Sequence, residues 1–357
     1  MRLYLYSGRE FSIELEIGGP FMRVIETNFV KDGESIVIIP TGNWLHELAI
    51  YPYVRLGKTV MKATVSTDMR YIEMFKEKYG LEHFSRYFSK ARESIVLTPC
   101  GSEPGYNYDH LGKIFDIANE NYISAVKENW VQLYMRRETL RLLKRYANKG
   151  DRILDLGCGP MSEVLSLGDD FLITEVDVSE RALSEARKTG RSNVNYILFR
   201  GPESISGIYD IVFSSYGFLN TEGKENVISI LEKNLRPGGI FIGSFLNKFG
   251  AMDILLNFVL GRFDYCRQRI SGFLPVNFSR YNSLSYPRSP SYLLDSPLLT
   301  KEERRGICLI SPPYNFTRLV KILGKLRIIE NLDRVLSGLP LVWAISDYIL
   351  FAYRKSI

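Results

Sequence analysis

Hydrophobic and polar positions alternate over short distances in the first 65 residues of the chain, a pattern typical of β-strands. Turns rich in glycine and proline separate these runs, for example at 18–20 and 40–43. The expected strands are 2–6, 11–17, 22–30, 35–39, 60–65 and 93–97, and the expected helices are 69–79 and 83–91. A linker-like segment follows at 100–105. We therefore expect an N-terminal α+β domain over residues 1–104, in which no known motif is recognised.

From residue 106 to 146 the apolar spacing is helical, and beyond it strands alternate with helices. The expected strands are 152–156, 171–176, 194–199, 209–213 and 240–244, with helices at 179–188 and 225–234. Such alternation implies a parallel sheet that helices cover on both faces. In sheets of this kind ligands bind at the carboxyl ends of the strands, where we expect Gly157, Asp177, Glu203 and Ser214.

The first of these strands runs directly into a glycine turn, with the sequence DRILDLGCGP over residues 151–160. Asp177, at the end of the second strand, lies twenty positions after Gly157. This layout is typical of a nucleoside site, with bare backbone at the turn and an acid for the ribose hydroxyls. A nicotinamide cofactor is the alternative, but its motif prefers a third glycine where this chain has Ser162.

Further motifs follow in a fixed order, and together they resemble those of the class I S-adenosylmethionine-dependent methyltransferases. The resemblance covers about residues 106–357 and is strongest to enzymes acting on small molecules, quinones or lipids. It is carried by the glycine motif at 153–160, Asp177 after strand two, YDIVFSS at 209–215 and LRPGG at 235–239. Upstream, Tyr108-Asp109 and Phe115-Asp116 are similar to the paired aromatic–Asp signature of the helix that covers the cofactor.

The resemblance implies a doubly wound α/β fold with a seven-stranded, mostly parallel, Rossmann-like sheet over residues 105–357. It implies S-adenosylmethionine as cofactor, with Asp177 on the ribose, Arg136 near the cofactor carboxylate, and Asp155 orienting the turn or the amino group. The predicted cofactor-binding residues are Asp155, Gly157, Cys158, Gly159, Asp177, Val178, Glu203, Ser214, Ser215 and Arg136. The chain departs from the family pattern at Met161, which replaces its third glycine, and at Pro202, which stands where an adenine-binding acid is usual.

After residue 245 the sheet is expected to be interrupted by a helical cap insertion over about 246–310, followed by a helix at 315–323 and a last, antiparallel strand at 345–353. Residues 249–260 form an almost wholly apolar helix in which Asp253 and Asn257 make a narrow polar stripe. A helix that is apolar nearly all round is usually buried, so we favour a lid over the site. Docking of this helix on a membrane surface is the alternative.

The bulk composition is that of a folded protein with room for two domains, since 45% of its 357 residues are apolar and 24% charged. The net charge of +6 is uneven: residues 1–104 are neutral, whereas 245–290 hold six basic residues against two acidic ones. Such a basic stretch either attracts an anionic substrate, lipid headgroup or RNA, or is a solvated face. Four scattered cysteines without a CxxC pair argue against a zinc site or a disulfide framework, and no metal is expected.

No basic-then-apolar leader follows Met1 and no apolar run reaches the ~18 residues that a membrane span requires, so we expect a cytoplasmic protein. The expected acceptor is a small molecule, a quinone or a lipid-like compound. Aromatic residues lie among basic ones in the cap and would suit such a ligand: Phe263, Phe273, Tyr281, Tyr286 and Tyr292. His110 is a weak candidate for a general base, against the simpler interpretation of a surface helix residue.

Two other functions remain open at this point. Residues 1–104 could recognise RNA for methylation, although their neutral charge argues against a phosphate-binding face. The fold could also be a non-catalytic scaffold, as the departures at Met161 and Pro202 would permit. The segment SPPYNF at 311–316 resembles a motif of amino-methyltransferases, but it lies far beyond strand five, and we interpret it as a proline-rich entry to the helix at 315–323.

Overall fold

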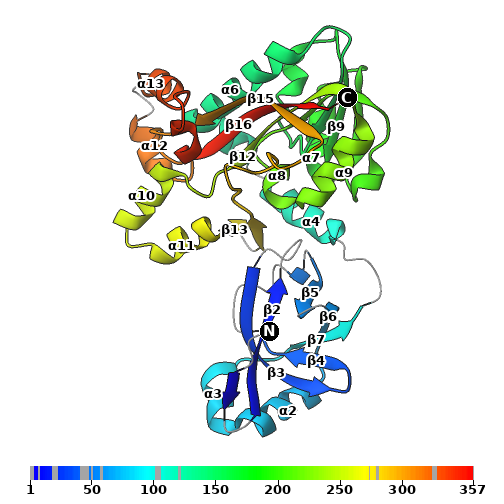
Figure 1. Cartoon of the computed structure of the whole chain (residues 1–357), viewed down its shortest axis with the longest axis vertical. Helices are drawn as coiled ribbons and strands as arrows, with labels where there is room; N and C mark the ends of the chain where they lie inside the picture. Colours follow the sequence, from blue (N-terminus) through cyan, green and yellow to red (C-terminus); the bar gives the residue numbers. More distant parts are fainter. Residues whose placement is uncertain are drawn as a thin grey trace. The chain divides into compact units, whose positions relative to one another are not determined.

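The computed structural model describes residues 4–6, 9–17, 23–40, 48–49, 51–56, 59–100, 106–119, 122–272, 274–278, 281–323 and 328–356. The chain forms two compact units, Met1–His110 and Leu111–Ile357 (Figure 1). The division falls within helix α4 (Tyr108–Ala118). No helix among the described residues combines the length and the hydrophobicity that crossing a bilayer would require.

The described part of the N-terminal unit is an antiparallel sheet with two helices. Its strands are β1 (Tyr4–Tyr6), β2 (Arg9–Ile17), β3 (Arg23–Asp32), β4 (Ser35–Ile38), β5 (Tyr53–Leu56), β6 (Thr59–Ser66) and β7 (Ser94–Pro99), and its helices are α2 (Met69–Tyr79) and α3 (Leu81–Phe88). The strands of this sheet are ordered β1-β2-β3-β4-β7-β6-β5. Because β5 also pairs with β2, the sheet closes on itself. The sequence pattern did not indicate β5, because only Val54 of its four residues is fully buried.

Two hydrophobic clusters lie on opposite faces of this sheet. Because neighbouring residues of a strand point to opposite faces, β4 sends Ile36 and Ile38 into one cluster and Val37 into the other. The second cluster includes Ile72 and Phe75 of α2, so this helix covers one face of the sheet. The unit therefore has a core of its own.

The C-terminal unit holds a second sheet, whose described strands follow the order β10-β9-β8-β11-β12-β16-β15. These strands are β8 (Arg152–Leu156), β9 (Leu172–Asp177), β10 (Val194–Leu198), β11 (Tyr209–Ser214), β12 (Leu235–Leu246), β15 (Leu299–Ile307) and β16 (Tyr348–Lys355). The first five in the order are parallel, and β16 runs antiparallel between β12 and β15. The predicted α/β fold with a mostly parallel seven-stranded sheet is confirmed.

Helices and short 3-10 turns connect these strands. They are α4, α5 (Tyr122–Lys127), α6 (Trp130–Tyr146), η1 (Val164–Leu167), α7 (Glu180–Arg187), η2 (Pro202–Ser204), α8 (Phe218–Thr221), α9 (Lys224–Asn234), α10 (Ala251–Val259), α11 (Phe263–Ser271), α12 (Thr317–Leu323), α13 (Ile328–Leu336) and η3 (Val342–Ile345). Ser179 is the N-cap of α7, as predicted, and accepts a hydrogen bond from the N–H of Ala182. A two-stranded hairpin of β13 (Leu274–Phe278) and β14 (Tyr281–Ser285) follows α11.

The boundary expected for the inserted cap was wrong. Residues 299–307, placed inside the cap at 246–310, form β15 at the edge of the main sheet. This strand carries consecutive charged residues from Lys301 to Arg305 and therefore lacks an apolar alternation. Charged side chains are common on edge strands because they discourage pairing with another chain.

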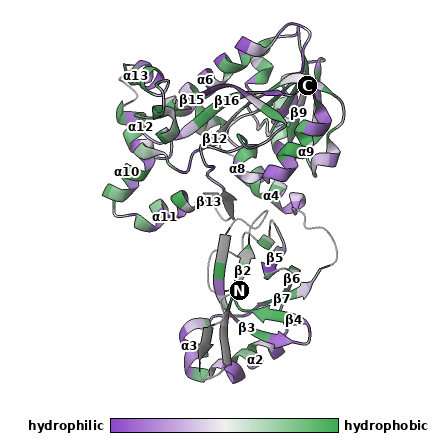
Figure 2. Cartoon of the chain, in the orientation of Figure 1, coloured by the Kyte–Doolittle hydropathy of each residue, from purple (hydrophilic) through white to green (hydrophobic). Residues whose placement is uncertain are grey.

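The apolar helix of the cap is present as α10. Contrary to the expectation for a lid, it buries polar residues and exposes apolar ones. Its buried residues include Asp253 and Asn257, whereas Leu255 and Val259 are exposed. Figure 2 shows green, hydrophobic colouring along α10. The reason is an ionic cluster beneath the helix. The guanidinium of Arg269, itself buried, bonds Asp253 Oδ2 at 2.5 Å and Asp347 Oδ1 at 2.6 Å.

Candidate functional site

A cavity of about 330 Å³ lies at the carboxyl ends of β8, β9 and β11. Its walls come from α4, the glycine turn after β8, and the loops after β9 and β11. Tyr314, between β15 and α12, and Tyr348, the first residue of β16, also line it. The lining residues are Leu111, Phe115, Ala118, Asn119, Tyr122, Gln132, Met135, Arg136, Gly157, Cys158, Gly159, Pro160, Val176, Asp177, Val178, Phe199, Ser215, Tyr216, Gly217, Phe218, Thr221, Glu222, Tyr314 and Tyr348. The cavity thus lies at the edge of the sheet where parallel α/β proteins bind ligands.

The glycine turn presents bare backbone to this cavity. Gly157 and Gly159 have φ angles of +75° and +61°, which side chains disfavour. A Cβ on Gly157 would lie 2.9 Å from the Cβ of Phe218, so there is no room for one. The N–H groups of Gly157 and Cys158 donate to the carbonyl of Val176 at 2.7 and 3.1 Å, which holds the turn against β9.

Asp177 is fixed beside the turn by two backbone donors. Its Oδ2 accepts the N–H of Gly159 at 2.9 Å, and its Oδ1 accepts the N–H of Ser179 at 2.8 Å. Burial raises the pKa of Asp177 to about 6, although both N–H groups act in the opposite direction. Because each carboxylate oxygen has further acceptor capacity, Asp177 can still receive hydrogen bonds from a pair of hydroxyls.

Helix α4 packs closely over the loop that follows Asp177. The hydroxyl of Ser179 donates to Asp116 Oδ1 at 2.6 Å and accepts from Nδ2 of Asn119 at 3.1 Å. A Cβ on Gly112 would lie only 2.6 Å from the carbonyl oxygen of Val178. The Phe115-Asp116 pair singled out in the sequence therefore lies at the cavity, with Phe115 in its wall.

Arg136 gives the cavity a buried positive charge. Its guanidinium lies 3.0 Å from Glu163 Oε1, and it also donates to the carbonyl of Met161 and to the Tyr122 hydroxyl. Burial lowers the pKa of Arg136, but Glu163 and Tyr122 outweigh burial and raise it, so the side chain stays cationic. Ser215, which also lines the cavity, donates to Glu163 Oε2 at 3.2 Å.

Asp155 lies beneath the turn and does not line the cavity. The Ser162 hydroxyl is 2.7 Å from Asp155 Oδ2 and 2.9 Å from Glu175 Oε1. Burial, and then the neighbouring Glu175, raise the pKa of Asp155 well above its usual range, and burial raises that of Glu175 to about 7. The two carboxyl groups therefore form a buried pair in which protonation of one member is favoured.

Other predicted residues also lie away from the cavity. Ser214 is buried in the sheet, where its hydroxyl donates to the carbonyl of Leu156 at 3.0 Å. Glu203 is exposed on η2 and His110 is on α4, and neither lines the cavity. In contrast, Cys158 and Val178 do line it, as predicted positions of the cofactor site.

A cluster of tyrosines, which the sequence analysis missed, forms one wall: Tyr122, Tyr216, Tyr314 and Tyr348. Tyr216 has φ of +53°, a conformation that costs of order 1–3 kcal/mol in a non-glycine residue. Its hydroxyl donates to the carbonyl of Met135 at 2.6 Å, its N–H donates to Ser244 Oγ at 3.0 Å, and its ring meets that of Tyr348 edge to face. The available signals were the position of Tyr216 just after the strand-four motif and that of Tyr314 in SPPYNF.

The aromatic residues expected to receive the acceptor lie elsewhere. Tyr286 and Tyr292 are buried outside the cavity, and Tyr292 packs against Phe245. Phe263 is exposed on α11 and meets Phe258 edge to face. Phe273 and the side chain of Tyr281 lie outside the described residues. Phe263, Tyr286 and Tyr292, which we expected to suit the acceptor, therefore do not line this cavity.

A family model described as a methyltransferase domain matches residues 154–243. The matched segment contains the glycine turn, Asp177 and the cavity-lining residues after β11. The part of the C-terminal unit that carries most of the cavity wall is therefore similar to a methyltransferase domain.

The chain is similar to several curated proteins. It is 24% identical over 168 residues to an uncharacterized protein of Methanocaldococcus jannaschii, covering 44% of this chain and 62% of that protein. Over 79 residues it is 34% identical to ribosomal protein L11 methyltransferase of Thermotoga neapolitana, covering 20% and 30%. Over 167 residues it is 24% identical to 27-O-demethylrifamycin SV methyltransferase of Amycolatopsis mediterranei, covering 42% and 61%. The chain thus covers less than two thirds of the length of each of these relatives.

The chain is also similar to solved structures. Phosphoethanolamine N-methyltransferase 2 of Haemonchus contortus, in complex with S-adenosyl-L-methionine, has a TM-score of 0.45 and 14% identity, with 85% of this chain and 71% of that chain covered. A putative S-adenosylmethionine-dependent methyltransferase of Listeria monocytogenes has a TM-score of 0.43 and 19% identity, with 62% and 98% covered.

Proposed function

We propose that the cavity holds S-adenosylmethionine, with the methionine part along the glycine turn and the ribose at Asp177. Two features support this fit. The backbone at Gly157 and Gly159 leaves a cradle that side chains would fill. The fixed carboxylate of Asp177 can accept from both ribose hydroxyls.

The remaining cofactor contacts follow from charge and polarity. Arg136 would bind the carboxylate of the methionine part, because it is a buried cation at the cavity wall. Val178 and Phe199 would pack against the adenine, and Phe199 is itself held edge to face by Phe218. Glu203, one of the predicted cofactor-binding residues, is exposed and does not line the cavity, so the adenine would rest on apolar contacts.

When bound, the cofactor would supply an electrophilic methyl group on a sulfonium. A lone pair of the acceptor would bond to the methyl carbon as the S–CH3 bond breaks, and its electron pair would stay on sulfur in S-adenosylhomocysteine. The protein contributes positioning, which can supply much of the rate of such a reaction. Tyr216, Tyr314 and Tyr348 would orient the acceptor, and Gln132 and Glu222 offer it polar contacts. The acceptor proton would pass to water or to one of these polar groups.

We infer a small-molecule, quinone or lipid-like acceptor. The observation that carries this proposal is the tyrosine wall beside the glycine turn, because aromatic walls with a few polar groups suit such ligands. The Amycolatopsis relative supports it, since its name gives 27-O-demethylrifamycin SV, a small molecule, as its acceptor.

Calorimetric titration with S-adenosylhomocysteine tests the cofactor site. We expect micromolar binding by the wild type and binding at least tenfold weaker, or about 1.4 kcal/mol, in Asp177→Ala. Asp169→Ala removes an exposed carboxylate and is the matched control, for which no change is expected. Absence of binding by a well-folded wild type would contradict the proposal. Transfer of a labelled methyl group to a panel of phenols, quinols and lipids then tests the acceptor class.

A further inference from the structure

Two helices of the C-terminal unit have their polar side inside and their apolar side outside. In α10 the exposed apolar residues include Leu255, Phe258 and Val259, and Val259 has 73% of its surface exposed. In α13 they are Ile328, Leu332 and Val335, which share one face at i, i+4 and i+7. Both helices thus present apolar stripes to solvent, an arrangement opposite to that of an ordinary surface helix.

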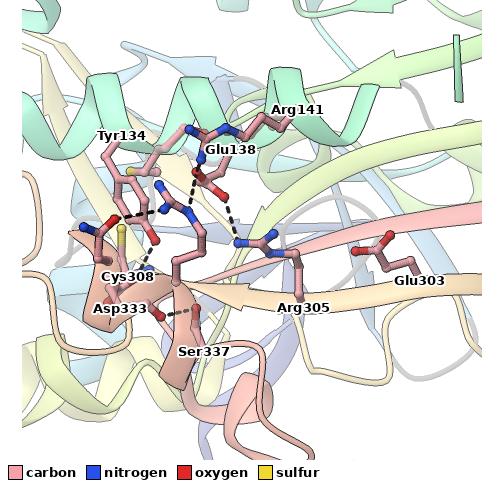
Figure 3. Close-up of polar contacts among 12 residues, drawn as sticks. Tyr134, Glu138, Arg141, Glu303, Arg305, Cys308, Asp333 and Ser337 are labelled. Atoms are coloured by element: carbon pink, nitrogen blue, oxygen red, sulfur yellow. Dashed lines mark hydrogen bonds and ion pairs between the residues drawn. The ribbon is translucent and has the colours of Figure 1, made fainter. Parts of the chain in front are cut away.

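Neither helix can turn its apolar side inward without breaking buried polar bonds. Asp253 of α10 is tied to Arg269, and the Tyr265 hydroxyl also donates to it at 2.8 Å. On α13, Asp333 Oδ2 accepts from the Tyr134 hydroxyl and from the N–H of Cys308, both at 2.9 Å (Figure 3). Leaving such groups unpaired inside the protein would be costly, so the outward apolar stripes are fixed by the fold.

The stripes belong to one region of the unit, which we call the α10–α13 face. Figure 1 shows α13, α12, α10 and α11 one below another along the left side of the C-terminal unit. Contact is direct between the α10–α11 turn and the start of α12, because the Arg262 guanidinium lies 5.9 Å from the ring centroid of Phe316. Leu260 and Phe263 flank Arg262 and are also exposed.

The charge of this face is positive. Arg262, Arg318 and Lys321 are exposed on or beside these helices. Acidic side chains on the same helices are matched by arginines: Asp264 lies 3.2 Å from Arg267, and Glu330 lies 2.5 Å from Arg137. The exposed apolar residues are therefore accompanied by basic groups whose charge is not cancelled by these acids.

We propose that the α10–α13 face docks on the surface of an anionic lipid bilayer. Exposed apolar side chains with neighbouring basic residues are what an interfacial helix needs, because the apolar part enters the acyl boundary and the cations meet anionic headgroups. Contact with a bilayer is peripheral, since no described helix is long and apolar enough to cross it. This docking does not depend on the proposed methyl transfer.

Co-sedimentation of the full chain with vesicles tests the docking. We expect binding to vesicles of phosphatidylcholine with phosphatidylglycerol, and at least tenfold weaker binding to phosphatidylcholine alone or in high salt. The double variants Phe258→Ser/Phe263→Ser and Leu332→Ser/Val335→Ser should each weaken binding at least tenfold. Arg318→Glu/Lys321→Glu should weaken binding to the anionic vesicles only.

The matched control is Leu172→Ser/Ile208→Ser, which removes apolar residues of similar exposure, 57% and 49%, from other elements. It should bind vesicles as the wild type does, and thermal unfolding should confirm that every variant is folded. Failure of the wild type to bind anionic vesicles would overturn the proposal, and so would equal loss in the control. A wild-type dimer in solution that Phe258→Ser/Phe263→Ser dissociates would show that a second copy covers this face instead.

Discussion

The hydroxyl of Ser179 donates to Asp116 Oδ1 over 2.6 Å, and this bond fastens α4 to the loop that follows Asp177. The N–H of Arg181 donates to the same oxygen at 3.1 Å, so Asp116 also holds the first turn of α7. The carboxylate of Asp116 thereby joins α4 to the segment directly after Asp177, the residue that we propose binds the ribose. The position of α4 should therefore govern affinity for the cofactor.

Gly112→Ala tests this dependence on α4. The added Cβ would stand 2.6 Å from the carbonyl oxygen of Val178, so α4 or the loop must shift. Overpacking of this kind typically costs about 1–3 kcal/mol, and we expect the Kd for S-adenosylhomocysteine to rise about tenfold. Calorimetry measures it, with Lys113→Ala as an exposed control on the same helix. Unchanged affinity in Gly112→Ala would show that α4 does not need this close approach.

Affinity for S-adenosylhomocysteine should fall in mild acid. Asp177 must be ionised to accept from two ribose hydroxyls, and its pKa is about 6 in the folded chain. Below that pH the Kd should rise about tenfold per pH unit. Asp177→Asn should bind more weakly near neutral pH and lose this dependence. Because that variant retains Asp155 and Glu175, an identical pH profile in it would assign the titration to the buried pair.

Glu175→Gln should make the chain less sensitive to alkaline conditions. Burial raises the pKa of Glu175 to about 7, so the folded state takes up its proton more readily than the unfolded state. Because the pKa of this carboxyl group is higher in the folded state, its contribution to the free energy of unfolding is fully present below about pH 4. That contribution is lost as the pH rises toward 7. We expect the variant to exceed the wild type by about 3 kcal/mol in the free energy of unfolding near pH 8.

Urea titrations at several pH values measure this difference. The matched control is Glu180→Gln, which removes an exposed carboxylate from the first turn of α7. It should leave the pH dependence of stability as it is in the wild type. A Glu175→Gln variant that is less stable than the wild type near pH 8 would mean that the carboxylate charge is needed, contrary to its burial.

Local patterns gave much of the fold. The strand predicted at 152–156 coincides with β8, because a short apolar run followed by a glycine turn has few other interpretations. The N-cap of α7 at Ser179 was equally local. In contrast, β15 was missed because its run of charged residues does not look like a strand in the sequence. Such a run suits an edge strand, and only the assembled sheet shows that β15 lies at the edge.

Only the part of the cavity that local sequence patterns encode was predicted. Gly157 and Cys158 lie within one local motif, Asp177 ends the next strand of the sheet, and all three line the cavity. The tyrosine wall was missed because Tyr122, Tyr216 and Tyr348 come from segments far apart in the sequence. The orientation of α10 likewise depends on distant partners, since Arg269 joins Asp253 to Asp347.

Arg269→Ala should strongly destabilise the C-terminal unit. Arg269 is 2% exposed and pairs with both Asp253 and Asp347, so its removal leaves these two buried carboxyl groups without their arginine partner. Breaking a buried ion pair from one side typically costs about 3–5 kcal/mol, and we expect a loss of that size in the free energy of unfolding near neutral pH. The control is Arg267→Ala, two positions away, whose exposed pair with Asp264 should contribute less than about 1 kcal/mol.

The pH dependence of that loss identifies its cause. Asp347 already has a pKa of about 6, which burial raises and Arg269 opposes. Without the arginine the pKa of Asp347 rises further, so in acid this carboxyl group takes up a proton and no longer places a charge in the interior. The loss of unfolding free energy in Arg269→Ala should therefore be smaller near pH 5 and larger near pH 8. Urea unfolding of both variants at these pH values measures it. A deficit that does not change with pH would mean that Arg269 stabilises α10 through packing of its long side chain rather than through its charge.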